Sequence, residues 1–90
     1  MLFTWDEDKN TENQAKHDGM SFEEVVPVLI EGGYEVEYDR EQSTPDEDRF
    51  IASGEVDFHG KIVVVFIEIE SEFPESDEVR IISSRRKDAK

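Results

Sequence analysis

The chain has 90 residues, no cysteine and a formal net charge of −14 at pH 7. The lack of cysteine excludes disulfide bonds and thiolate metal sites, and the longest apolar run, residues 62–67, is too short to span a membrane. A chain of this length without internal repeats predicts one domain over residues 1–90, and because its start does not resemble a signal peptide, we expect a cytoplasmic protein.

The start of the chain predicts a short strand followed by a helix. Residues 2–5 form an apolar and aromatic stretch that ends at Asp6. Asp6 can accept hydrogen bonds from the first backbone N–H groups of a helix, and Gly19 stands where a helix usually stops. We therefore expect a strand over residues 2–5 and a helix over residues 7–17.

A second helix is predicted by the tetrapeptide at residues 21–24, Ser-Phe-Glu-Glu. In this capping box the serine and the glutamate three residues later satisfy each other's backbone donors. The helix should cover residues 22–31, lie largely buried and end at Gly32-Gly33. Pro27 lies in its second turn, where it removes a hydrogen bond and bends the helix.

The rest of the chain predicts four strands, because its apolar residues alternate with polar ones over short runs. The expected strands cover residues 34–38, 49–58, 61–70 and 78–84, and they are joined by an acidic loop at 40–48, a two-residue turn at His59-Gly60 and a turn at 71–77. Gly54 should form a bulge or a bend in its strand.

This order of elements, a strand, two helices and then four strands, predicts an α+β fold. Both helices should pack on one face of a mostly antiparallel sheet of four or five strands, which leaves the other face free to form a site. Strict alternation places Arg80 on that free face, because its neighbours Val79 and Ile81 would pack on the helices.

Two motifs at opposite ends of the chain resemble those of BrnT-type toxins. The first is FTWDEDKN at residues 3–10, followed by Asn13, Lys16-His17, Gly19 and the capping box, and the second is VRIISSRR at residues 79–86. In addition, Asp48-Arg49-Phe50 is similar to the acid, arginine and aromatic triplet that begins a strand in this family. The resemblance covers nearly the whole chain in matching order.

The resemblance implies a ribonuclease toxin of the RelE-like superfamily, one half of a type II toxin–antitoxin pair, that cleaves RNA without a metal or another cofactor. It also implies a basic ribbon-helix-helix antitoxin as partner, through which the pair would contact DNA. The alternative is a toxin-like interaction module without nuclease activity. The acidic composition fits that alternative, because a basic protein complements it better than RNA does.

Arginine suits RNA cleavage, because its planar fork binds two phosphate oxygens and stays protonated. We expect Arg80 to be catalytic, with cross-strand pairing to Glu68 or Glu70 as its alternative role. Arg49 is a second catalytic candidate that could instead pair with neighbouring acids. Candidates for binding RNA or the antitoxin are Lys16, Lys61, Arg85 and Arg86. The alternative for the two arginines at the end is a solvated basic tail.

His17 is the third catalytic candidate, because an imidazole titrates near neutral pH and can act as general base or acid. It shares one face of the first helix with Asn10 and Asn13. The alternative is a structural cap, since histidine is favoured at the C-terminus of a helix. His59 is most simply a turn residue.

The acidic residues do not predict a metal site, because the acidic triplets at residues 6–8 and 46–48 lack the glycine and the spaced ligands of a calcium loop. The net charge of −14 has three interpretations: repulsion of nucleic acid, complementarity to a basic partner, or adaptation to a saline interior. Composition alone does not choose among them.

Overall fold

The computed structural model describes residues 2–17, 19–31, 35–56 and 59–87. Within these ranges the elements in chain order are β1 (Leu2–Thr4), α1 (Glu7–Lys16), α2 (Phe22–Glu31), β2 (Glu35–Tyr38), β3 (Arg49–Val56), β4 (Gly60–Ile69), the short 3₁₀ helix η1 (Pro74–Ser76) and β5 (Glu78–Arg86). Two helices pack with a five-stranded mixed sheet, so the predicted α+β class is confirmed.

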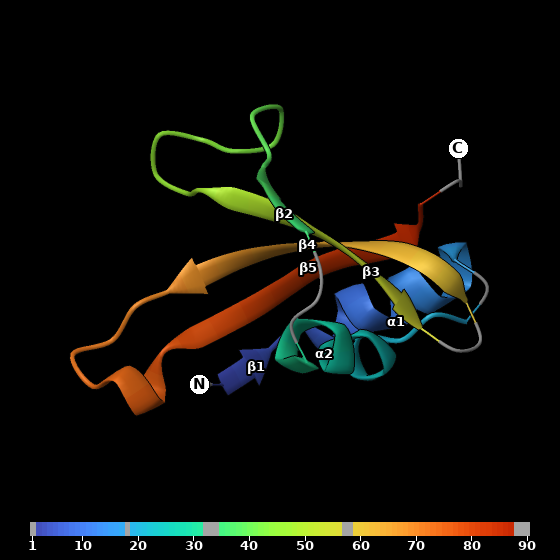
Figure 1. Cartoon of the computed structure of the whole chain (residues 1–90), viewed down its shortest axis with the longest axis horizontal. Coiled ribbons are helices and arrows are strands. Elements are labelled where there is room, and N and C mark those ends of the chain that lie inside the picture. Colours follow the sequence, from blue (N-terminus) through green and yellow to red (C-terminus); the bar gives the residue numbers. More distant parts are fainter. Residues whose placement is uncertain (1, 18, 32–34, 57–58, 88–90) are drawn as a thin grey trace.

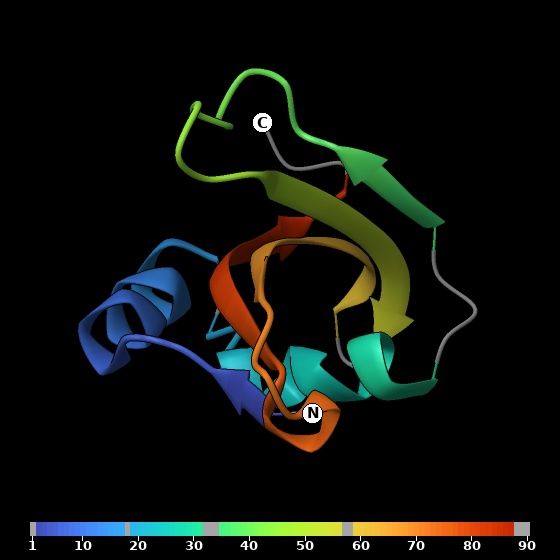
Figure 2. The same cartoon turned by 90° about the vertical axis from the view of Figure 1, so that its left-hand side faces the viewer.

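The sheet has the strand order β1-β5-β4-β3-β2. The pair β1–β5 is parallel and the other three pairs are antiparallel. Figure 1 shows that the hairpin of β4 and β5 extends well beyond the rest of the sheet, and Figure 2 shows that the sheet curves strongly, with α2 lying across its open side. The fold therefore leaves one curved face turned away from α2.

The two helices begin where their capping residues predict. The side chain of Asp6 accepts hydrogen bonds from the backbone N–H groups of Asp8 and Lys9. Ser21 and Glu24 form the capping box, since each backbone N–H donates to the other's side-chain oxygen at 3.3 Å. Neither described helix is long and apolar enough to cross a membrane.

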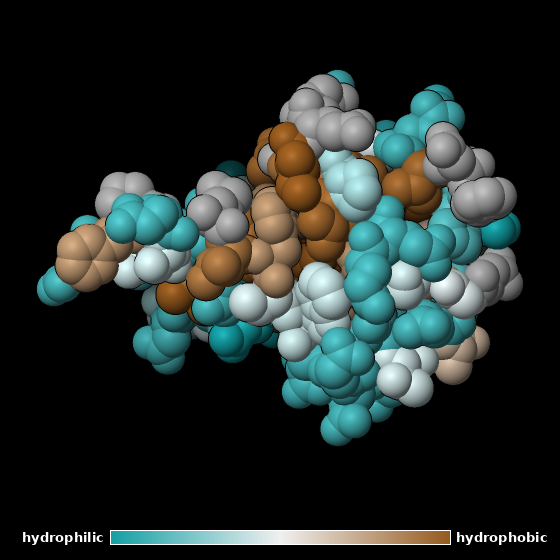
Figure 3. Space-filling view, turned by 90° about the horizontal axis from the view of Figure 1, so that it is seen from below, coloured by the Kyte–Doolittle hydropathy of each residue, from teal (hydrophilic) through white to brown (hydrophobic). Residues whose placement is uncertain are grey.

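The hydrophobic core lies between α2 and the sheet. Met20, Phe22 and Val25 are fully buried on the helix side, and they pack against Val64 and Ile81 of the central strands. Figure 3 shows that hydrophobic residues also gather on the surface over the middle of the face seen from below. The large hydrophobic residues that remain exposed in the described chain are Leu2, Ile30, Val36, Tyr38, Ile69 and Phe73.

One prediction about strand geometry is wrong and another is tested only in part. Gly60 pairs with Val56 and belongs to β4, so it is not part of a two-residue turn. Of the predicted bulge or bend at Gly54, the bulge is absent, because the β3–β4 register runs through it without a shift, and the bend stays a prediction. An added Cβ at Gly54 would overlap Val28 Cγ1 of α2, so this glycine lets the helix approach the sheet. The predicted helix end at Gly32-Gly33 and the predicted strand residues Tyr34, Asp57 and Phe58 lie outside the described residues.

His59 fastens the β3–β4 connection to α2. Its Nε2 lies 2.9 Å from Oε2 of Glu24, and its side chain is only 8% exposed. Burial by itself would raise the pKa of Glu24, but the hydrogen bonds from His59 and Ser21 outweigh it, and the pKa of Glu24 is lowered below its ordinary value. The predicted turn residue is therefore also a tertiary contact.

Candidate functional site

The strand register sorts the side chains of the sheet onto two faces. Ala52, Val64 and Phe66 share the face that packs on α2. On the opposite face, here called the helix-free face, Arg49 pairs with Ile67 and Ile67 pairs with Arg80. Two of the three predicted catalytic residues therefore flank one isoleucine in a single row across β3, β4 and β5.

Arg80 projects from the helix-free face as alternation predicts, with Val79 and Ile81 buried on the other side. Its guanidinium binds Glu78 of the same strand, with Nη2 2.8 Å and Nε 3.1 Å from Oε2. The predicted alternative, a cross-strand pair with Glu68 or Glu70, is not the contact that the structure shows. The Arg80 side chain remains 48% exposed, so it is accessible to a ligand.

A groove of about 490 Å³ opens beside Arg80. The residues that line it are Phe50, Ile67 and Ile69, the basic Arg80, and the acidic residues Asp46, Glu47, Asp48, Glu68 and Glu70. Glu68 and Glu70 were expected near Arg80 as its alternative partners. The acids of the loop reach the groove only through the fold. Glu68 pairs with the buried Val79 and so faces the other side of the sheet, but Arg80 beside the loop acids Asp46, Glu47 and Asp48 still makes the groove attractive to cations and unfavourable for a free phosphate.

Arg49 is held by the acidic loop. Its Nε donates to Oε1 of Glu47 at 3.0 Å, and its Nη1 donates to Oε1 of Gln42 at 3.5 Å. The backbone N–H of Arg49 also donates to Oγ of Ser43. Pairing with a neighbouring acid, the alternative that the sequence left open, is therefore present in the structure.

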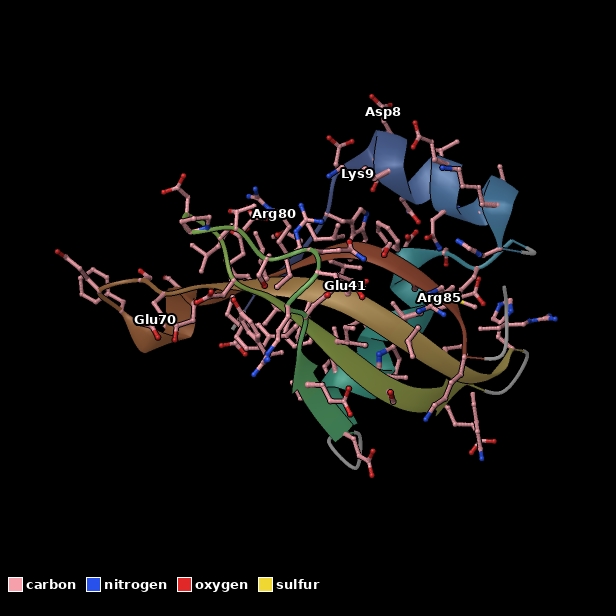
Figure 4. The ribbon with its side chains drawn as sticks, turned by 90° about the horizontal axis from the view of Figure 1, so that it is seen from above. Asp8, Lys9, Glu41, Glu70, Arg80 and Arg85 are labelled. Carbon is pink, nitrogen blue, oxygen red and sulfur yellow. The ribbon has the colours of Figure 1, made fainter. Side chains whose placement is uncertain are left out.

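A bulge in β5 turns Arg85 toward the same face as Arg80. The β4–β5 register shifts between Val65 and Phe66, and no residue of β4 pairs with Ile82. As a result Ser83 and Arg85 lie on the helix-free face and Ser84 is fully buried on the other. Figure 4 looks onto the helix-free face and shows Arg80 and Arg85 at separate positions along β5, with Glu41 of the acidic loop between them in this view.

Three of the predicted binding residues meet at the end of the sheet where β4 begins. Val63 pairs with Arg85 and Ile62 pairs with Arg86, while the backbone N–H of Lys87 donates to the carbonyl of Lys61 at 2.9 Å. We call Lys61, Arg85, Arg86 and Lys87 the basic end. The strand β5 runs to Arg86, two residues further than predicted, so the basic cluster is part of the sheet rather than a tail.

The remaining candidates lie on α1, which is fastened to β5 by a buried amide. Asn13 Nδ2 donates to Oγ of Ser84 at 2.9 Å, and Asn13 Oδ1 accepts from the Ser84 backbone at 3.1 Å. His17 follows as the C-cap of α1, next to Lys16. Because β1 places Thr4 beside Arg80 and the helix then runs toward Ser84, His17 lies toward the basic end and away from Arg80.

The structure therefore groups the candidates into two sets. Arg49 and Arg80 lie by the acidic groove, and the basic end lies at the other end of β5. The sequence did not predict the structural role of two asparagines. Asn10 Oδ1 accepts a hydrogen bond from the backbone N–H of Phe22, and Asn13 links α1 to Ser84 of β5. Among the described residues, no group of three or more His, Asp or Glu side chains is placed to hold a metal ion.

Comparison with protein families matches the chain to a family described as the ribonuclease toxin BrnT of type II toxin–antitoxin systems. The match covers residues 5–90, which include every candidate residue described above. No curated protein matches the chain.

Proposed function

This chain belongs to the BrnT family of type II toxin–antitoxin ribonuclease toxins, and we propose that it is an active, metal-independent endoribonuclease held in check by a basic ribbon-helix-helix antitoxin. The observation that carries the proposal is the row Arg49–Ile67–Arg80 on the helix-free face. The toxin would act on RNA in the cytoplasm and would reach DNA only through its antitoxin.

The proposed chemistry needs charge stabilisation more than any other contribution. When the RNA 2′-hydroxyl attacks the adjacent phosphorus, the P–O5′ bond breaks, and the products are a 2′,3′-cyclic phosphate and a 5′-hydroxyl that takes up a proton. The extra negative charge of the five-coordinate intermediate falls on the non-bridging oxygens, where guanidinium groups stabilise it. Arg49 and Arg80 start roughly 10 Å apart, two strand spacings, so their long side chains can converge above Ile67.

The basic end would hold the RNA backbone. Arg85 faces the same side as Arg80 and Lys61, Lys87 is hydrogen-bonded to Lys61 through the backbone, and Arg86 points to the other face because it pairs with the buried Ile62. Lys16 would add to this contact from the end of α1. A catalytic role for His17 stays a prediction, because α1 contacts β5 at Ser84, on the other face of the sheet from the two arginines.

A second function is favoured by one observation, the mainly acidic residues that line the groove beside Arg80. They repel the phosphates of RNA and attract the positively charged side chains of a protein. A toxin-like module that only binds a basic antitoxin would use the same groove without cleaving anything. The two functions differ in whether the chain alone damages RNA.

Expression of the chain without an antitoxin tests the proposal. The unmutated chain should arrest growth and degrade RNA, and the purified protein should cleave RNA equally well with EDTA present. Arg80→Ala should reduce the cleavage rate about 10²–10³-fold, since it removes a charge that stabilises the intermediate. Arg40→Ala is the matched control, because Arg40 is an exposed arginine of the acidic loop.

Intact RNA and normal growth, at confirmed soluble expression of the unmutated chain, would reject the nuclease and leave the interaction module. His17→Ala decides the open catalytic assignment, since a loss as large as that of Arg80→Ala would make the imidazole part of the chemistry. A small basic ribbon-helix-helix reading frame next to the gene would support the antitoxin assignment under either function.

A further inference from the structure

Strand β2 forms an edge of the sheet that is open along its whole length. The strand order places it last, next to β3 alone, and all four of its residues, Glu35–Tyr38, are exposed. Within the described ranges no element pairs with its outer side, and Figure 2 shows this edge on the outside of the curved sheet. An uncovered edge strand offers its free backbone groups to another extended chain.

The register tells which backbone groups of β2 point outward. Asp39 N–H donates to the carbonyl of Arg49 at 2.8 Å, so this pair is hydrogen-bonded. In an antiparallel ladder such pairs alternate with pairs that are not bonded, which makes Glu35 and Glu37 bonded to β3. The N–H and C=O groups of Val36 and Tyr38 therefore face away from the sheet.

The two faces of this edge have different chemistry. Val36 and Tyr38 lie on the core side, and their side chains are half exposed, at 48% and 50%. Tyr38 packs edge-on against Phe50 at 5.9 Å, and Phe50 stacks on Phe66 at 5.8 Å, so the core reaches the edge without a cover. Glu35 and Glu37 occupy the helix-free face, and both are exposed.

We infer that β2 is a docking edge for an extended segment of a partner protein in which lysine or arginine alternates with apolar residues. Apolar side chains of such a segment would pack beside Val36 and Tyr38 and extend the core, while its cations would lie opposite Glu37 and Glu35. Glu35 lines a hollow of about 300 Å³ together with Lys61 and Lys87, whose positive charges oppose the binding of further cations there. Glu37 therefore contributes the larger part of the attraction for the basic residues of the partner segment.

The charge pattern excludes a second copy of this chain as the occupant. Antiparallel pairing of two β2 strands around Val36 would set Glu35 of each copy opposite Glu37 of the other, four carboxylates on one face. The net charge of −14 on each copy adds a long-range repulsion. A basic partner meets neither the local nor the long-range repulsion. For a member of a toxin–antitoxin family, the antitoxin is the protein that would supply the segment.

The inference goes beyond the proposed function, because binding at β2 needs neither RNA nor cleavage, and the test is run without RNA. The probe is the synthetic peptide KVKVKVK, titrated into the full-length protein while amide signals and amide hydrogen exchange are followed by NMR. The amides of Val36 and Tyr38 should exchange fast in the free protein and become protected with peptide. Those of Glu35 and Glu37, already bonded to β3, should change little.

Variants then separate the edge from general charge attraction. Glu35→Lys with Glu37→Lys should weaken binding of KVKVKVK about tenfold and allow EVEVEVE to bind instead. The control is Glu12→Lys with Glu72→Lys, which changes the net charge equally at exposed sites away from β2. The scrambled peptide KKVVVKK should bind more weakly, because it has the same charge without the alternation.

Three results would overturn the inference. One is the absence of protection at Val36 and Tyr38 at millimolar peptide. Another is an equal loss of affinity in the two charge-reversal variants, which would mean that only net charge matters. The third is protection of these amides without peptide that rises with protein concentration, which would assign the edge to a second copy.

Discussion

Gly54 gives the sharpest test of how α2 is seated on the sheet. The glycine lies at an ordinary strand position, and a Cβ there would overlap Val28 Cγ1. Inserting a methyl group into a packed core costs about 1–3 kcal/mol, and replacing glycine by alanine returns about 0.4–1 kcal/mol by restricting the unfolded chain. Gly54→Ala should therefore destabilise the protein by about 1.3 kcal/mol, the middle of a range from roughly 0 to 2.6 kcal/mol.

The physical reason can be isolated with a double-mutant cycle. Val28→Ala alone leaves a small cavity and costs at least the transfer free energy of the lost methyl groups, about 1.6 kcal/mol. In that background the methyl group of Gly54→Ala has room, so the second substitution should become neutral or stabilising. The expected coupling between the two sites equals the overpacking, about 1–3 kcal/mol.

Urea unfolding followed by far-UV circular dichroism measures all four corners of the cycle, and thermal unfolding should show shifts of about 4–8 °C per kcal/mol for a domain of this size. Gly60→Ala is the control, because Gly60 has φ of +71° and no neighbour near its Cβ position. Its cost is backbone strain, which Val28→Ala cannot relieve. Additive effects of Gly54→Ala and Val28→Ala within about 0.5 kcal/mol would refute the close approach of α2.

Two further substitutions test other contacts of the fold. Because the pKa of Glu24 is lowered in the folded protein, its contact with His59 stabilises the fold above the unfolded pKa of 4.5 and is lost as pH falls through the lower folded value. Glu24→Gln should flatten the fall in unfolding free energy below pH 4.5, measured by urea unfolding. The control Glu12→Gln, at an exposed position, should leave this fall as it is in the unmutated chain. Equal curves for Glu24→Gln and the unmutated chain would contradict the prediction. Asn13→Ala should cost roughly 3 kcal/mol in the same assay, because the buried N–H and hydroxyl of Ser84 lose their partner, and a loss under about 1 kcal/mol would show that the site rearranges.

Local signals made much of this fold predictable. Asp6 and the Ser21–Glu24 box fix where the helices begin through contacts within one turn, so the sequence contains the whole interaction. The outward position of Arg80 follows in the same way, since both of its neighbours are apolar and alternation is a property of the strand itself.

Features that depend on distant partners were not predictable. The role of Gly54 depends on Val28, which reaches it only after α2 packs on the sheet. The face of Arg85 depends on the bulge at Ile82, where simple alternation from Arg80 would have turned it the other way. By contrast, the ion pair between Arg80 and Glu78 could have been predicted from the sequence, because residues two apart in a strand share a face.

The parallel pair β1–β5 joins the two ends of the chain. Leu2, Phe3 and Thr4 have no strand partner until residues 78–80 arrive, and β5 itself separates β1 from β4. Closing so long a loop is slow, and during synthesis the sheet stays incomplete until β5 has been made. Arg80 and Arg85 thus take their places only once β5 has joined the sheet, so a nascent chain that still lacks β5 cannot present the face that we assign to RNA.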